Sequence, residues 1–393
     1  MNIPKDVKYI IDKLNANNYQ AYVVGGCVRD SLMGKTPTDY DITTNATPEQ
    51  ITNIFLKTVK TGVKFGTVTV VIDGKNYEVT TFRVDGLYEN FRKPINVNFS
   101  NNLLDDLSRR DFTINAIAYH PNTGYIDPFS GMSHIKNKIV QAVGNPNIRF
   151  NEDALRMLRC IRFASKLGFN TERGTVAAIS INAHLMSNIS KERIRDELIK
   201  MLLVDNLDNL NILNNTHVFK NVHTDLYKYF QENLIRKLSI IKHTKKDAIT
   251  RLSILFDECS NPKDILKFLK LSNDQITQIT RLIQAIKQPL YADSYCIKSR
   301  ILQIMPQGVI RLIDVKQAQG EQTTQIKTLY DKIIENNEPI YLNQLAINGE
   351  ILKEYGIAQG KEMGIVLKYL HKCILKEPHL NNKIDLIKKI AQM

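Results

Sequence analysis

The feature that most constrains this chain is a change of hydrophobic pattern near residues 144–147, where Gly, Asn and Pro cluster. Before this point, residues 63–72 and 77–84 are rich in β-branched side chains and joined through Asp73-Gly74, a strong hairpin signal. After it, apolar residues recur at helical spacing and strand signals nearly vanish. The 393 residues are too many for one hydrophobic core. We therefore predict an α+β fold, with a head containing a small mixed sheet at 1–143, a helical neck at 144–205, and a helical body and tail at 206–393.

Local signals within the head are clear. Residues 5–17 predict a helix, 21–24 a strand that ends at Gly25-Gly26, and the residues after it a short helix through Leu32. A second strand is expected over 39–43, and another helix after Thr47, with Pro48 in its first turn. Residues 85–100 contain Gly, Pro and several Asn without a sustained period, which predicts a loop.

Composition limits the classes of function. A formal charge of +13 and a pI near 9.3 favour a polyanionic partner, although a merely solvated basic surface explains the charge equally well. The five cysteines lie far apart without a CxxC motif, which argues against a zinc site and a disulfide framework. No apolar run approaches the ~18 residues of a membrane span. We expect a cytoplasmic protein that contacts no membrane.

The segment Asp39-Tyr40-Asp41-Ile42 places two carboxylates in one predicted strand. Side chains at positions i and i+2 of a strand point to the same face, so both carboxylates should project together. Two like charges this close need a shared proton or a divalent cation, and hard oxygen ligands suit Mg²⁺. Taken alone, the pattern is more often a solvated edge strand with two unrelated acids.

The turn at Gly25-Gly26 follows a predicted strand and opens a predicted helix. Glycines let the backbone approach a ligand closely, and amides at a helix N-terminus favour an anion. Arg29 lies one turn into that helix, in a position to bind a phosphate. A glycine turn followed by an aspartate pair is more specific than either motif alone.

These motifs together resemble the signature of the polymerase-β-like nucleotidyltransferases. The chain has the three parts of that signature at Val24-Gly25-Gly26, Asp39-Tyr40-Asp41-Ile42 and Tyr77-Glu78-Val79. The stretch GGCVRDSLMGKTPTDYDITT is similar to class II tRNA nucleotidyltransferases, the bacterial CCA-adding enzymes, and to their relatives the bacterial poly(A) polymerases. The resemblance implies a polymerase-β-like head, Mg²⁺ as cofactor, and Asp39 and Asp41 as catalytic metal ligands. Glu78 is either a third carboxylate at this site or only a structural polar residue.

Two further motifs carry the same resemblance: RRDFTINA at 109–116 and EDALRMLRCIRF at 152–163. Spacing alone predicts one helix over 150–168, whose flank sets three arginines near one aspartate, a surface able to bind a base edge or phosphates. The resemblance implies that Asp153 and Arg156 select the base of CTP and then ATP, with the later arginines nearer the phosphates. The nucleotide-binding residues expected on this basis are Gly26, Arg29, Arg110, Asp153, Arg156, Arg159 and Arg162. The segment ISKERIRDEL at 189–198 resembles the family's neck and is expected to support the template helix.

The resemblance implies an enzyme that adds C, C and A to the 3′ end of tRNA from CTP and ATP. Poly(A) polymerases, CC-adding enzymes and A-adding enzymes share these motifs. The chain lacks the long basic extension expected of the first and carries a loop at 85–96 that the second lacks, whereas the A-adding alternative stays open. A non-catalytic RNA-binding protein would explain the charge, but not the combination of aspartates, glycines and arginines. The sequence leaves the oligomeric state open, a homodimer included.

Overall fold

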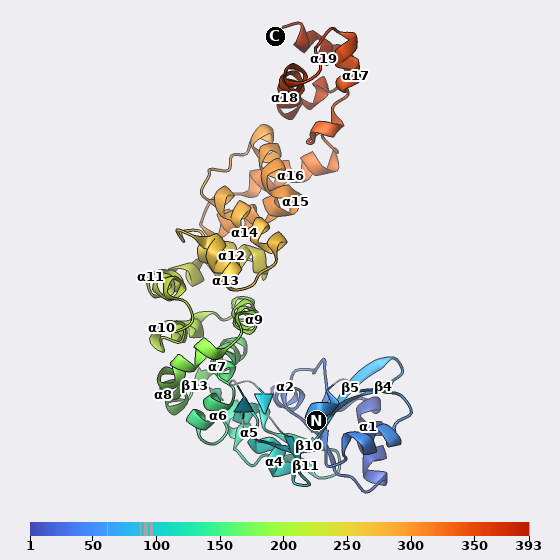
Figure 1. The fold of residues 1–393 in the computed structure, drawn as a ribbon, viewed down its shortest axis with the longest axis vertical. Coiled ribbons are helices and arrows are strands. Elements are labelled where there is room, and N and C mark those ends of the chain that lie inside the picture. The colour runs from blue at the N-terminus through green and yellow to red at the C-terminus, as the bar shows by residue number, and fades with distance from the viewer. Residues whose placement is uncertain (61, 87, 90–92, 95–96, 393) are drawn as a thin grey trace. The chain divides into compact units, whose positions relative to one another are not determined.

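The computed structural model describes residues 1–60, 62–86, 88–89, 93–94 and 97–392. The chain divides into two compact units, Met1–Ile235 and Arg236–Met393 (Figure 1). The first unit contains a mixed sheet with its helices, and the described part of the second is helical. The predicted α+β class is confirmed. The predicted boundaries after residues 143 and 205 both fall within the first unit and stay predictions.

The sheet-forming head occupies the start of the first unit. Its helices are α1 (Lys5–Ala16), α2 (Gly26–Leu32), α3 (Pro48–Ile54), α4 (Leu103–Ser108) and α5 (Gly131–Lys136), with 3₁₀ turns at Val63–Phe65 and Thr113–Asn115. Its strands are β1 (Ala21–Val24), β2 (Asp41–Thr44), β3 (Thr58–Val59), β4 (Thr67–Ile72), β5 (Lys75–Thr81), β6 (Arg83–Asp85), β7 (Tyr88–Glu89), β8 (Lys93–Pro94), β9 (Val97–Phe99), β10 (Ala118–His120), β11 (Gly124–Ile126) and β12 (Ile139–Val140).

Seven of these strands form one sheet in the order β11-β10-β1-β2-β5-β4-β3. Strands β2 and β5 run parallel, and the other neighbours are antiparallel. The predicted hairpin is confirmed, because Asp73 (φ 47°) and Gly74 (φ 78°) both adopt the left-handed conformation between β4 and β5. Apolar side chains of α1 and the sheet, among them Ile10, Val23 and Val79, form the head core. This core fixes the central strands β1, β2 and β5, on which the candidate site is built.

The segment 85–100 differs from the predicted loop. In its described part, β6 pairs with β9 and β7 pairs with β8, so short ladders replace the irregular chain that we expected. Val97 and Phe99 have high strand propensity, and they form a strand here because β6 provides a partner for pairing. Arg92, one of the charged residues of the predicted loop, lies outside the described residues.

The remainder of the first unit is helical apart from β13 (Asn170–Thr171), which pairs with β12. Its helices are α6 (Pro146–Glu152), α7 (Leu155–Leu167), α8 (Arg173–Asn182), α9 (Lys191–Leu202), α10 (Ile212–Asn215) and α11 (Thr224–Ile241), the last of which continues into the second unit. The second unit adds α12 (Ala248–Phe256), α13 (Pro262–Phe268), α14 (Asn273–Ile286), α15 (Ser294–Ala318), α16 (Thr324–Glu335), α17 (Gly349–Glu354), α18 (Lys361–Lys376) and α19 (Lys383–Ile390).

Two observations bear on the class of protein. None of the described helices is both long and apolar enough to cross a membrane. All five cysteines carry free thiols. Burial raises the pKa of Cys27 to about 11 and that of Cys160 to about 12, so these thiols act as packing groups rather than nucleophiles.

Candidate active site

The two predicted metal-binding aspartates lie at the start of β2. The strand begins at Asp41 and not at Asp39, because the neighbouring strand β1 ends at Val24, the register partner of Asp41. Asp39 therefore precedes the strand, and strand alternation does not bring the two carboxylates together as predicted. They still interact: burial raises the pKa of Asp41, the negative charges of Glu78 and Asp39 raise it further, and Arg110 opposes the rise.

Glu78 lies on β5 directly opposite Asp41. Within the described part of the chain, however, no group of three or more His, Cys, Asp or Glu side chains is arranged to hold a metal ion. Mg²⁺ usually takes one or two protein carboxylates and completes its shell with waters and substrate phosphates. The mutual repulsion at Asp41 fits such a two-carboxylate site, and a ligand role for Glu78 stays a prediction.

Gly25 is the turn position at which a side chain would be most crowded, and the predicted nucleotide-binding role of Gly26 stays a prediction. The φ of Gly25, 80°, belongs to the left-handed region, and a Cβ there would lie 3.0 Å from Nη1 of Arg110 and 3.7 Å from Oδ2 of Asp41. A Cβ on Gly26 would make only an ordinary contact, 3.5 Å from Nη2 of Arg29. The missing side chain at Gly25 thus lets Arg110 approach the carboxylate of Asp41.

Arg110 is held in place by Asp106, a residue that our sequence reasoning missed. Asp106 is fully buried at the end of α4 and accepts from Nη2 of Arg110 at 3.0 Å, Nη2 of Arg109 at 2.5 Å and the hydroxyl of Thr43 at 3.2 Å. Burial works to raise the pKa of Asp106, but the two guanidinium groups outweigh it and hold the pKa below its usual value. The sequence did contain a signal for these ion pairs. Asp106 precedes Arg109 and Arg110 by three and four residues, a spacing at which side chains meet on a helical turn.

Asp153 lies between two helices, which corrects the predicted continuous helix over 150–168. Helix α6 ends at Glu152, α7 begins at Leu155, and Asp153 is extended (φ −139°, ψ 101°). Its carboxylate accepts from the Leu155 amide at 3.0 Å, a local bond that competes with helix formation. Nη2 and Nη1 of Arg193, on α9, donate to its two oxygens at 2.8 and 3.2 Å. The 189–198 segment therefore supports the template motif as predicted.

Each arginine of α7 has its own carboxylate, instead of three sharing one aspartate as the spacing suggested. Arg156 pairs with Glu152 at 2.5 Å. It also donates to the carbonyl of Arg109 at 2.9 Å. Two further ion pairs, each of 2.6 Å, join Arg159 to Asp111 and Arg162 to Glu197. Arg156 is 9% exposed, whereas the side chain of Arg159 is 35% exposed and is the most open to a ligand.

Asp111 and Arg29 also have roles that the motifs did not reveal. Asp111 accepts hydrogen bonds from Arg159 and Asn115. Burial works to raise its pKa, and Arg159 with these hydrogen bonds lowers it overall. Arg29 is 3% exposed and donates to Asn115 at 2.6 Å and Asp30 at 2.8 Å. A phosphate role for Arg29 therefore requires a ligand that reaches an already paired guanidinium.

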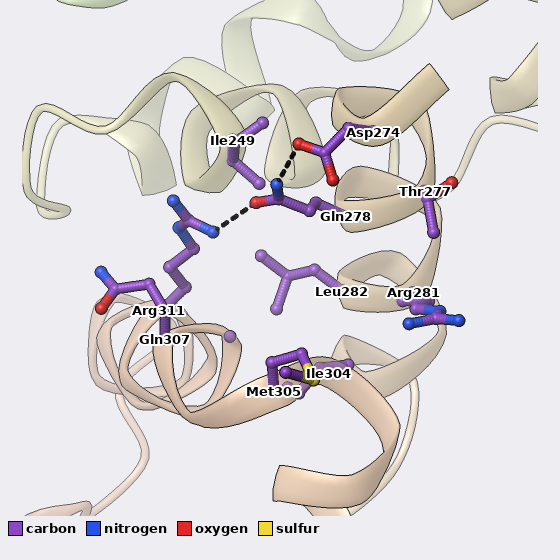
Figure 2. A pocket seen from close by; sticks show the side chains of 11 residues that line it. Ile249, Asp274, Thr277, Gln278, Arg281, Leu282, Ile304, Met305, Gln307 and Arg311 are labelled. Carbon is purple, nitrogen blue, oxygen red and sulfur yellow. Dashed lines mark hydrogen bonds between the residues drawn. The ribbon is translucent and has the colours of Figure 1, made fainter. Parts of the chain in front are cut away.

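A pocket of about 350 Å³ in the second unit contains none of the predicted site residues. Figure 2 shows it between α12, α14 and α15, with Arg311 hydrogen-bonded to Gln278 and Gln278 to Asp274. An apolar floor that includes Leu282 and Met305 completes it. The predicted aspartates and the arginines of α7 belong to the other unit. We therefore place the candidate active site at the glycine turn, not at this pocket.

Comparisons with known proteins show the class to which the chain belongs. The family model of the Poly A polymerase head domain matches residues 21–141, the probable RNA and SrmB-binding site of polymerase A matches 168–229, and the putative tRNA nucleotidyltransferase domain 2 matches 240–390. These matches give a nucleotidyltransferase with a poly(A) polymerase-type head.

The relatives narrow this class. A CCA-adding enzyme of Ligilactobacillus salivarius is 37% identical over 100% of this chain and 98% of its own length, and one of Enterococcus faecalis is 39% identical over 74% of this chain and 72% of its own. The crystal structure of the Bacillus stearothermophilus CCA-adding enzyme in complex with CTP is 30% identical and covers 100% of this chain and 99% of that one, with a TM-score of 0.84. This chain belongs to the family of CCA-adding enzymes.

Proposed function

We propose that this chain adds C, C and A in order to the 3′ end of tRNA, using CTP and ATP and releasing pyrophosphate. The observation that carries the proposal is the interaction of Asp39 with Asp41 beside Gly25 and Arg110, in a chain similar along its whole length to CCA-adding enzymes. Complexes of such enzymes with CTP and with tRNA support the assignment of substrates.

The chemistry of nucleotidyl transfer fits the residues present. Asp39 and Asp41 would hold Mg²⁺, which when bound supplies charge neutralisation at the attacking hydroxyl and the triphosphate. Arg110, held by Asp106, places a fixed positive charge beside Asp41. This charge would stabilise the negative charge that develops on the phosphates in the transition state. Arg159 and Arg162 supply further guanidinium donors from the neck, already fixed by Asp111 and Glu197. Preorganised charges of this kind cost no rearrangement during the reaction.

Base selection follows from the acceptor at Asp153. Cytosine and adenine both carry an exocyclic amino group that donates a hydrogen bond, whereas uracil and guanine carry a carbonyl oxygen at the corresponding position. A carboxylate oriented by Arg193 accepts from the first pair and repels the second. Asp153 lies between two helices, so helical geometry does not set the direction of its side chain. The ion pair with Arg193 orients the carboxylate instead.

Asp153→Ala is therefore expected to lower discrimination for CTP and ATP against UTP and GTP by at least about tenfold, the value of one good polar base contact. Competition kinetics on a tRNA acceptor with all four nucleotides measure the ratio. Asp196→Ala is the matched control, because Asp196 is an exposed aspartate on α9 whose ion pair is with the adjacent Arg195. Unchanged discrimination in Asp153→Ala, or an equal loss in the control, would remove Asp153 from the template.

The segment 85–96 is the candidate lever that re-aims the template between C and A addition. Glu89, Arg92 and Lys93 within it and Arg83 just before it are the charged residues considered. Much of it lies outside the described residues, so this stays a prediction from the sequence. Shortening the segment is expected to leave CC addition intact and to impair the final A. The measurement is extension of tRNA ending in CC with ATP, and full A addition by the shortened protein contradicts the idea.

The helical second unit would hold the tRNA. Lysines are dense over residues 353–389, which suits a surface that follows phosphates, and the tRNA nucleotidyltransferase domain 2 match covers most of this unit. The cytoplasm is the proposed compartment, because it contains tRNA and nucleoside triphosphates and keeps thiols reduced. A homodimer stays an untested prediction that sedimentation of the purified chain would decide.

A further inference from the structure

Phe163 on α7 is surrounded by three arginines that the proposed function assigns to the nucleotide. The guanidinium carbons of Arg29, Arg159 and Arg162 lie 5.3, 5.4 and 4.3 Å from the centroid of its ring. All three distances are within the range of a cation–π interaction, about 6 Å. The ring is only 8% exposed, so these contacts form in a largely desolvated place, where such interactions are strongest.

The arrangement joins separate parts of the first unit. Arg29 comes from α2, directly after the glycine turn, whereas Arg159 and Arg162 come from α7 itself. Behind the ring, Phe112 packs edge-to-face at 5.8 Å and 72°, which restrains its tilt.

Three cations around one ring repel each other, and the structure offsets this repulsion. Separate carboxylates neutralise them: Asp30 beside Arg29 at 2.7 Å, Asp111 beside Arg159 and Glu197 beside Arg162, both at 2.6 Å. Each guanidinium group thus contacts both a carboxylate and the ring of Phe163. Hydrocarbon burial alone does not require an aromatic side chain at this point, since Leu would fill a comparable apolar space.

We propose that Phe163 is a positioning residue for the triphosphate: its ring holds the guanidinium groups of Arg29, Arg159 and Arg162 in one fixed array across the head and the neck. This inference rests on the proposed phosphate-binding roles of these arginines. Because the triphosphate is common to CTP and ATP, the array serves both substrates equally and takes no part in the choice of base.

The test is steady-state kinetics of Phe163→Leu, which keeps an apolar side chain but has no π face. KM is expected to rise about tenfold for CTP and for ATP by the same factor, with kcat changed less than about threefold and C-over-U discrimination unchanged. Phe163→Tyr, which keeps the ring, is expected to restore KM to near the wild-type value. Phe169→Leu is the matched control for lost packing, since Phe169 is 3% exposed and follows the same helix. It should lower Tm without changing KM.

Two further arms keep the outcome decisive. Should Phe163→Leu fail to fold, trifluorophenylalanine at this position keeps the shape and removes most of the negative charge of the ring face, and the same rise in KM is expected. Arg159→Ala and Arg162→Ala test the underlying assignment. If they raise KM while Phe163→Leu behaves like Phe169→Leu, the positioning role is wrong and the phosphate roles stand. If neither arginine variant changes KM, the phosphate roles fail, and the inference about Phe163 falls with them.

Discussion

Asp41→Ala is expected to lower the rate of nucleotide addition by on the order of 10³-fold, because it removes a carboxylate that would hold Mg²⁺ at the reacting phosphate. Asp39→Ala should also lower the rate, since the carboxylates of Asp39 and Asp41 interact and would bind the same metal site. Single-turnover extension of a tRNA ending at its discriminator base measures the rate, and filter binding of the same tRNA should be unchanged, because the proposed tRNA contacts lie in the helical regions.

Asp12→Ala controls for the general loss of an acidic side chain. Asp12 is an exposed aspartate on α1 in the same head, and its variant should extend tRNA at the wild-type rate. The assignment of the aspartates is contradicted if Asp41→Ala retains more than about a tenth of wild-type activity in the presence of Mg²⁺, since a lost metal ligand costs far more. A parallel loss of tRNA binding would instead show that the variant is misfolded or that this surface binds tRNA.

Gly25→Ala carries the second largest expected effect, a loss of activity of about 10²-fold from the displacement of one preorganised donor. The new Cβ would lie 3.0 Å from Nη1 of Arg110 and would push it away from Asp41. Displacement of Arg110 works against its ion pair with Asp106, in which Nη2 donates to the carboxylate at 3.0 Å. The backbone strain adds a loss of stability of about 1 kcal/mol.

Gly74→Ala separates the strain from the contact with Arg110. Gly74 has nearly the same φ, 78° against 80°, but a Cβ there meets nothing within 4 Å. Gly25 combines its positive φ with a ψ of −135°, so thermal melts should show at least as large a loss of stability for Gly25→Ala as for Gly74→Ala. Extension assays should show lost activity only for Gly25→Ala. Equal activity in both variants would mean that the approach of Arg110 to Asp41 has no part in catalysis.

Helices and strands were predictable from the sequence where only one face of the element is buried in the core. Helix α14 follows the helical spacing of apolar residues in this part of the chain, because its buried stripe alternates with polar positions. The hairpin at Asp73-Gly74 was predictable since its turn chemistry is local. Helix α12 differs, because all but one of its residues are buried, the polar Thr250, Arg251 and Ser253 among them.

The candidate site was predictable in its residue types but not in its contacts. Asp39 was placed in a strand whose start is decided by where β1 ends, a fact of pairing that the local pattern does not contain. Arg159 and Arg162 were identified, yet their partners Asp111 and Glu197 come from a loop and a helix far away in the sequence. The sequence assigns Phe163 no role of its own, because three arginines from two helices meet at its ring only in the folded chain.

The most direct test of the central claim is an extension assay on a sequencing gel. Purified protein and Mg²⁺ would be incubated with a tRNA transcript ending at the discriminator base, with CTP alone, ATP alone, or both. We predict two added Cs with CTP alone, one further A with both nucleotides, and then a stop. An unbounded ladder of A, a permanent stop at CC, or extension only of tRNA that already ends in CC would contradict sequential C, C and A addition by this chain, and no extension at all would contradict its assignment as an active enzyme.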